Sequence, residues 1–158
     1  MPQIDELKSI VLLSQLTHEM LEKIQPYIEL FIFKKDDTIF SEGSEAKNFY
    51  MLKSGKVILE KRISSKITVS LGTIKPGYSF GWSSILSKQP FTSESICTET
   101  SEIYSIKGDR VIELLNTDHS MGFIITQSLT RVLKDRLDRM EEQFLRAIRE
   151  NPDIKALM

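Results

Sequence analysis

The sequence has few of the residues from which most catalytic and metal sites are built. It contains one cysteine, Cys97, and two histidines among 158 residues, so an internal disulfide is excluded and a reducing compartment is favoured. The formal net charge of −1 removes the general electrostatic argument for binding nucleic acid. No apolar run approaches the length of a membrane span, and charged residues near the N-terminus exclude the apolar core of a signal peptide. These absences predict a soluble, cytoplasmic protein that binds neither nucleic acid nor a membrane.

The two histidines do not form a pattern typical of a metal or catalytic site. His18 belongs to an N-terminal helical segment and His119 to the entry of a long helix, and neither has a short metal-ligand spacing to Cys97. The predicted strands contain no histidine, and no nucleophile stands beside an activating base. We therefore expect no enzyme activity, no metal and no cofactor.

The hydrophobic pattern predicts a mainly β protein with flanking helices. Apolar residues recur at helical spacing between Ile4 and Val11, and Thr17 is a typical N-cap for a second helix that ends near Pro26. From Tyr27 to Lys107 the pattern changes to short strand-like runs separated by turn residues. These runs are IELFIF, DTIF, FYML, KVILEKRI, ITVSLGTI, YSFG, ESICTET and SEIYSIK. Such a succession predicts an antiparallel β-barrel or jelly roll.

After Gly108 the pattern becomes helical again, with one short helix and a long helix from about Asp118 to Glu150. The long helix carries apolar residues in steps of four and three, which predicts a coiled-coil seam. These residues are Leu133, Leu137, Met140 and Phe144. About 30 helical residues would be about 45 Å long, more than a small barrel can cover, so we expect a homodimer rather than packing on the barrel alone. We expect residues 1–150 to form a single domain with this dimerisation helix, and residues 151–158 a tail.

Several motifs together resemble the cyclic nucleotide-binding domain family. They are the segment SEGSEAKNFYMLKSGKVILEK, the PGYSFG turn before a short helix, and the long C-terminal helix. The glycines Gly43, Gly55, Gly77 and Gly81 fall where that family makes tight turns. The chain is most similar to the sensor domain of CRP/FNR-type bacterial regulators such as catabolite activator protein. The resemblance covers about Ile10 to Phe144.

The ligand cassette departs from the pattern of the family. The resemblance implies a Phe-Gly-Glu turn, a short helix whose N–H groups face the cyclic phosphate, and an arginine that pairs with that phosphate. Without a gap from Gly81, the glutamate position holds Trp82 and the arginine position holds Thr92, whereas the following Ser93 is retained. Two lost charged hydrogen bonds would weaken binding by about 3–6 kcal/mol, roughly 10²- to 10⁴-fold. We therefore expect no binding of cAMP in the usual way.

The cassette still predicts a small-ligand site, of unknown ligand or for an anion. Its serines and threonine either line a polar pocket or cap the short helix. The indole of Trp82 either stacks on a planar ligand or fills the pocket. The predicted ligand-binding residues are Leu71, Phe80, Gly81, Trp82, Ser83, Ser84, Thr92 and Ser93.

Taken with the family resemblance, these features predict a ligand-responsive regulatory domain without a DNA-binding domain. Only NPDIKALM follows Glu150, which is too short for a helix-turn-helix domain, so the chain is either a stand-alone sensor or a fragment of a longer regulator. One alternative is a degenerate scaffold that binds a regulatory protein partner and no small ligand. Another is a haem-type sensor.

Overall fold

The computed structural model describes residues 1–87 and 89–156. Its contacts divide the chain into two compact units, residues 1–125 and residues 126–158. Within the described residues, no helix combines the length and the apolar character that crossing a bilayer requires.

The N-terminal segment folds into helices α1 (Ile4–Leu7) and α2 (His18–Ile24), followed by the 3₁₀ helix η1 (Gln25–Tyr27). The Thr17 side chain accepts a hydrogen bond from the Met20 N–H at 3.2 Å, which confirms the predicted N-cap. Helix α1 is shorter than its apolar spacing predicts: the N–H groups of Ser9 and Ile10 donate to carbonyl oxygens three residues back, in tight turns after the helix. The Val11 N–H then donates to the distant Gly77 carbonyl oxygen at 2.9 Å.

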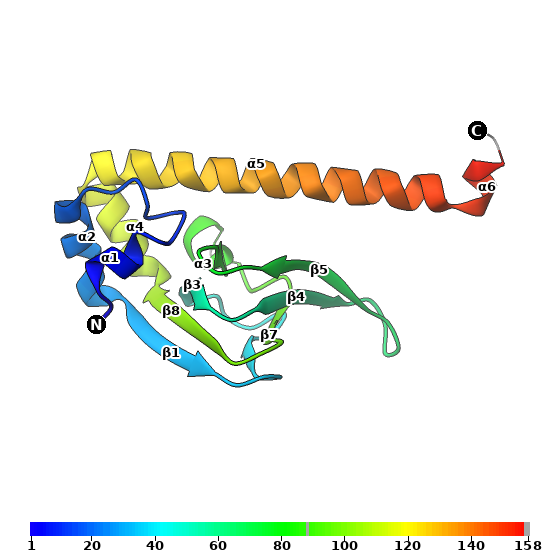
Figure 1. The fold of residues 1–158 in the computed structure, drawn as a ribbon, viewed down its shortest axis with the longest axis horizontal. Coiled ribbons are helices and arrows are strands. Elements are labelled where there is room, and N and C mark those ends of the chain that lie inside the picture. Colours follow the sequence, from blue (N-terminus) through cyan, green and yellow to red (C-terminus); the bar gives the residue numbers. More distant parts are fainter. Residues whose placement is uncertain (88, 157–158) are drawn as a thin grey trace. The chain divides into compact units, whose positions relative to one another are not determined.

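Eight antiparallel strands form two four-stranded sheets (Figure 1). One sheet has the order β1-β8-β3-β6 and the other the order β2-β7-β4-β5. The strands are β1 (Glu29–Phe33), β2 (Thr38–Phe40), β3 (Asn48–Ser54), β4 (Val57–Arg62), β5 (Thr68–Ile74), β6 (Ser79–Phe80), β7 (Glu94–Cys97) and β8 (Ser101–Lys107). The prediction of a mainly β jelly roll with flanking helices is confirmed. No ladder between described strands joins the two sheets, so the jelly roll does not close into a barrel.

The inner faces of the sheets enclose an apolar core. Alternation along β4 turns Val57 and Leu59 inward, where they are 0% and 4% exposed. The Phe40 and Phe91 rings stack with their centroids 3.8 Å apart. Burial raises the pKa of the Cys97 thiol, so this cysteine remains protonated and serves as a small apolar side chain.

Strand β1 forms an outer edge of its sheet, since β8 is its only partner among the described strands (Figure 1). Three consecutive apolar side chains on it are exposed, and Ile32 is the most exposed at 68%. The other two are Leu30 and Phe31.

Further helices interrupt or follow the strands. They are α3 (Ser83–Leu86), α4 (Gly108–Thr117) and α5 (His119–Glu150). The Gly108 backbone at the start of α4 packs directly against the Ser84 backbone, with no room for a Cβ. A Cβ at Gly122 in α5 would lie 2.7 Å from the Leu115 carbonyl oxygen of α4. Helix α4 therefore makes a close backbone contact with α3 at its first residue and another with α5 near its last turn.

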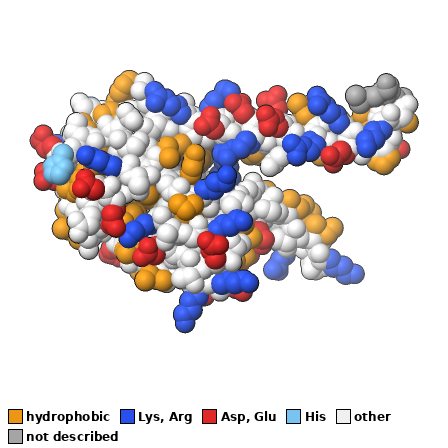
Figure 2. Space-filling view, in the orientation of Figure 1, with side chains coloured by type: hydrophobic (Ala, Val, Ile, Leu, Met, Phe, Trp, Pro, Cys, Tyr) orange, Lys and Arg blue, Asp and Glu red, His pale blue; other side chains and the backbone are white. Residues whose placement is uncertain are grey.

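The second unit consists of α5 from residue 126 onward and the short helix α6 (Pro152–Lys155). Asn151 caps α6 by accepting a hydrogen bond from the Asp153 N–H at 2.9 Å. Lysines, arginines and acidic residues are interspersed along α5 (Figure 2), and Lys134 pairs with Asp138 at 2.6 Å. The predicted seam residues are exposed in this chain, at 37%, 60%, 51% and 65% for Leu133, Leu137, Met140 and Phe144.

Candidate functional site

The turn between β6 and α3 is built around Gly81. Its φ of +75° is one that residues with a side chain rarely adopt. A Cβ at this position would lie 2.9 Å from Tyr50 Cδ2 and 3.5 Å from Phe91 Cε1. The aromatic side chains of Tyr50 and Phe91 thus fill the space directly beneath the turn. Burial raises the pKa of the Tyr50 hydroxyl, although a hydrogen bond with Asn48 opposes that shift.

Two backbone N–H groups of α3 are already bonded within the turn. The N–H of Ser84 donates to the Gly81 carbonyl oxygen at 3.2 Å, and that of Ile85 to the Trp82 carbonyl oxygen at 3.1 Å. The Ser84 hydroxyl also donates to the Gly81 carbonyl oxygen, at 2.8 Å, and the residue is 3% exposed. Ser84 therefore stabilises the turn.

The indole of Trp82 is half-buried, and its nitrogen is directed back toward β6. Its Nε1–H donates to the Ser79 hydroxyl at 3.2 Å. Ser79 is itself 4% exposed. The polar tip of the indole is thus bonded within the chain.

Three of the remaining predicted residues lie in or beside the β2-β7-β4-β5 sheet, and Phe80 lies in β6 of the other sheet. Thr92 is exposed just before β7, and Ser93 beside it is 7% exposed. Leu71 is 36% exposed and lies in a β-bulge of β5. Its neighbours Gly72 and Ser70 pair with the consecutive residues Leu59 and Glu60 of β4, which leaves Leu71 without a partner in the ladder. Phe80, predicted at the site, is 1% exposed and belongs to the core.

One cation at this site was missed by the sequence analysis. The Lys61 ammonium on β4 donates to the Thr92 carbonyl oxygen at 3.3 Å and pairs with the Glu42 carboxylate at 3.4 Å. The two-residue spacing from Val57 and Leu59 places Lys61 on the inner face of β4, a signal that the sequence did contain. That it meets Thr92, about 30 positions later, depends on strand pairing that the sequence pattern does not specify.

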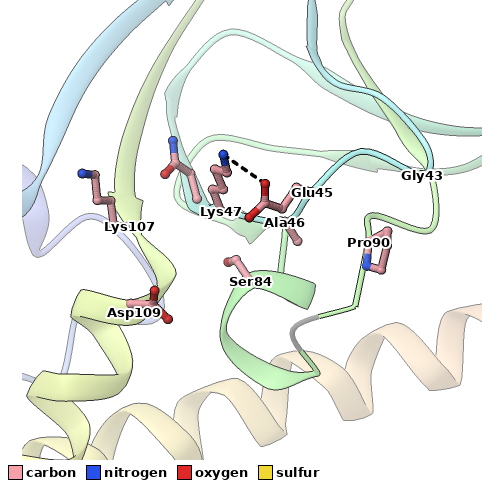
Figure 3. Close-up of a pocket in the computed structure, with 9 residues that line it drawn as sticks. Gly43, Glu45, Ala46, Lys47, Ser84, Pro90, Lys107 and Asp109 are labelled. Atoms are coloured by element: carbon pink, nitrogen blue, oxygen red, sulfur yellow. Dashed lines mark ion pairs between the residues drawn. The ribbon is translucent and has the colours of Figure 1, made fainter.

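A cavity of about 550 Å³ lies between α3, the segment before β3 and the start of α4 (Figure 3). Of the predicted site residues, Ser84 lines it. Lys47 and Glu45 at its rim form an ion pair at 3.0 Å. The other lining residues are Gly43, Ala46, Asn48, Pro90, Lys107 and Asp109. The predicted short helix therefore does border a cavity, but on a side to which the other predicted ligand residues do not contribute.

Among the described residues, no group of three or more histidine, cysteine, aspartate or glutamate side chains could hold a metal ion. His18 lies in α2, His119 begins α5, and Cys97 ends β7.

Comparison with known proteins identifies the fold. The family model for the cyclic nucleotide-binding domain matches residues 30–118. A candidate cyclic nucleotide-binding protein of Geobacter metallireducens is 28% identical, with a TM-score of 0.74, and the match covers 87% of this chain and 99% of that chain. Catabolite activator protein of Thermus thermophilus is 21% identical with a TM-score of 0.72, covering 89% and 64% respectively. A cyclic nucleotide-binding domain of Methylobacillus flagellatus is 16% identical with a TM-score of 0.75, covering 89% and 85%. A search of curated protein sequences gives no match.

Proposed function

Since this chain belongs to the cyclic nucleotide-binding domain family, we propose that it is a regulatory domain whose ligand site binds cAMP and cGMP far more weakly than is usual in the family. The observation that carries the proposal is the pair Trp82 and Thr92. They stand where the family resemblance places a ribose-binding glutamate and a phosphate-binding arginine. The Trp82 indole is bonded to Ser79, and the Thr92 side chain carries no charge.

The energetic consequence follows from the two lost charged groups. A hydrogen bond to a charged group contributes about 1.5–3 kcal/mol, so two losses correspond to roughly 10²- to 10⁴-fold in affinity. The internal bonding of the Ser84 and Ile85 N–H groups adds to this loss, because these amides are not available to a phosphate without breaking the turn. We expect dissociation constants above about 100 µM for both nucleotides.

A ligand in the cassette would act by favouring one position of α3 over another. The backbone contact between Ser84 and Gly108 supports this mechanism, since α3 cannot move toward α4 without displacing it. The contact of Gly122 with Leu115 then links α4 to the first turns of α5. Close-packed backbones transmit displacement because they have no side chain to absorb it.

We further propose that the domain is a homodimer joined through α5. The support is the exposed apolar stripe in steps of four and three, formed by Leu133, Leu137, Met140 and Phe144. A second copy of the same helix would bury this stripe and would bring two regulatory domains together.

Calorimetric titration of the purified protein with cAMP and cGMP tests the ligand proposal. We expect no saturable heat below about 100 µM in the unmodified protein and measurable binding in the double variant Trp82→Glu with Thr92→Arg. Tight binding of cAMP by the unmodified protein would show that other residues supply the missing contacts, and the proposal would fail.

A further inference from the structure

Lys61 brings a positive charge to the place where the cassette lacks one. Its ammonium lies 3.3 Å from the Thr92 carbonyl oxygen, although it belongs to β4 and is distant in sequence. Its side chain leaves the strand on the same face as Leu59, which is 4% exposed in the interior between the sheets. Lys61 therefore shares the face of Leu59, at an end of β4 where its side chain is 48% exposed, and its charge lies beside the backbone of the residue that replaces the arginine.

Two serine hydroxyls on β7 and its approach accompany this cation. The ladder pairs Leu59 with Ser95 and ends at Glu60 with Glu94, and Lys61 and Ser93 are the next residues beyond that pair. Ser93 and Ser95 are 7% and 0% exposed, and their two-residue spacing puts them on one face.

The Ser95 hydroxyl is the independent sign of a ligand. Within the part of the chain that the structure describes, its oxygen is buried and has no hydrogen-bond partner. Buried hydroxyls are nearly always bonded, so an unpaired one calls for an explanation. Phe40 and Leu59, which flank Ser95 on the neighbouring strands, offer it no polar atom from their side chains. An acceptor oxygen from a bound molecule would satisfy it.

We propose that Lys61, Ser93 and Ser95 form a binding site for the phosphate group of a ligand, with Lys61 supplying the charge that Thr92 does not. A lysine binds phosphate as a point charge, and serine hydroxyls donate to its oxygens. The inference rests on the proposed function, because it describes the anion-binding part of the same regulatory site. Glu42 now holds the Lys61 ammonium at 3.4 Å, so a bound phosphate takes the place of that carboxylate.

Variants of Glu42 distinguish a phosphate site from an ion pair that has only a structural role. If the carboxylate competes with phosphate, Glu42→Gln removes the competitor and strengthens phosphate binding. If the pair is only structural, Glu42→Gln and Lys61→Gln have the same small effect on stability and neither changes phosphate binding.

The experiment follows the Ser93 and Ser95 amide signals by NMR during titration with inorganic phosphate and, separately, with cAMP. The two titrations distinguish free phosphate from a phosphodiester. We expect saturable shifts at both amides, at least about tenfold weaker binding in Lys61→Gln, and about tenfold tighter binding in Glu42→Gln. Lys66→Gln, an exposed lysine in the loop of the same hairpin, is the control and should bind as the unmodified protein does.

Equal affinity of Lys61→Gln and Lys66→Gln would overturn the proposal, as would the absence of saturable shifts at Ser93 and Ser95 in both the unmodified protein and Glu42→Gln. The failure of this inference is distinguishable from failure of the proposed function. Recovery of cAMP binding by Trp82→Glu with Thr92→Arg would leave the regulatory function supported even if Lys61 has no part in it.

Discussion

Lys23 of α2 donates to Asp118, the residue that precedes α5, with 2.8 Å between Nζ and Oδ2. The other carboxylate oxygen of Asp118 accepts the Met121 N–H at 3.0 Å and so caps the helix. The hydrogen bond from Lys23 is the main cause that lowers the pKa of Asp118, and the same bond raises the pKa of Lys23. One carboxylate thus fixes both the start of α5 and its connection to α2.

This arrangement predicts a pH-dependent stability. The Asp118 pKa is lower in the folded chain than its ordinary 3.8. The stability that its charge adds to the folded state is therefore complete above pH 3.8 and is lost as the pH falls through the lower, folded-state pKa. Thermal melts of the unmodified protein and Asp118→Asn should therefore differ most near neutral pH and converge in strong acid. The asparagine keeps an oxygen for the cap, so the difference reports the charge. Glu99→Gln, which removes an exposed carboxylate, is the control and should melt as the unmodified protein does at each pH. A melting-temperature difference between Asp118→Asn and the unmodified protein that stays the same at every pH would contradict the assignment.

Gly108→Ala should destabilise the protein by about 1–3 kcal/mol, because the added methyl group must displace the Ser84 backbone. Helix propensity alone predicts the opposite sign, since alanine is favoured over glycine by about 1 kcal/mol. Chemical denaturation measures the difference. The exposed Asn116→Ala in the same helix provides the matched control and should be neutral or slightly stabilising. A stabilised Gly108→Ala would show that α3 and α4 are not tightly packed there.

Ser95→Ala should raise the free energy of unfolding by about 1 kcal/mol, because it removes a buried hydroxyl that has no partner among the described residues. Ser79→Ala should do the reverse, since it leaves the Trp82 Nε1–H without the hydroxyl to which it donates. Denaturation curves of the two variants measure both changes in the free energy of unfolding. Equal losses in both would mean that the Ser95 hydroxyl is bonded after all.

Of the two single restorations in the cassette, Thr92→Arg should gain more cAMP affinity than Trp82→Glu. The phosphate carries the charge of the ligand and a guanidinium binds it with two parallel hydrogen bonds, worth about 1.5–3 kcal/mol or roughly 10- to 100-fold. Isothermal calorimetry on both variants gives the order directly. The reverse order would indicate that steric exclusion by the indole, rather than the missing charge, limits binding.

The proposed dimer predicts a clear response to charge on α5. Leu137→Asp with Met140→Asp should shift the protein toward monomer in sedimentation experiments, because an unpaired charge buried in the seam is expensive. Arg139→Asp with Glu141→Lys, which changes exposed polar residues on the same helix, is the control. An unmodified protein that sediments as a monomer at high concentration would exclude the seam.

Most of the fold was predictable because it depends on local pattern. Thr17 caps α2 as its residue type predicts, and every predicted strand segment between Tyr27 and Lys107 overlaps an observed strand. The failures come from contacts between distant segments. Val11, which follows the turns after α1, bonds to the distant Gly77, and strand pairing leaves the two sheets unjoined among the described strands.

The candidate site was less predictable for the same reason. The position of Gly81 and the turn-forming role of Ser84 follow from local geometry. The approach of Lys61 to Thr92 and the isolation of the Ser95 hydroxyl arise only when β4 and β7 pair. A residue-by-residue comparison with the family's cassette examines only the cassette positions, so it cannot reveal a cation supplied by a neighbouring strand.

The exposed edge of β1 has a consequence for how the protein behaves in concentrated solution. Its backbone groups on the free side can pair with any other extended chain, and Leu30, Phe31 and Ile32 would be buried by that pairing. The lysines Lys34 and Lys35 directly after the strand oppose this, since stacking identical strands in register would bring like charges together. Aggregation on heating should therefore begin at β1 and should increase with salt, which screens those charges.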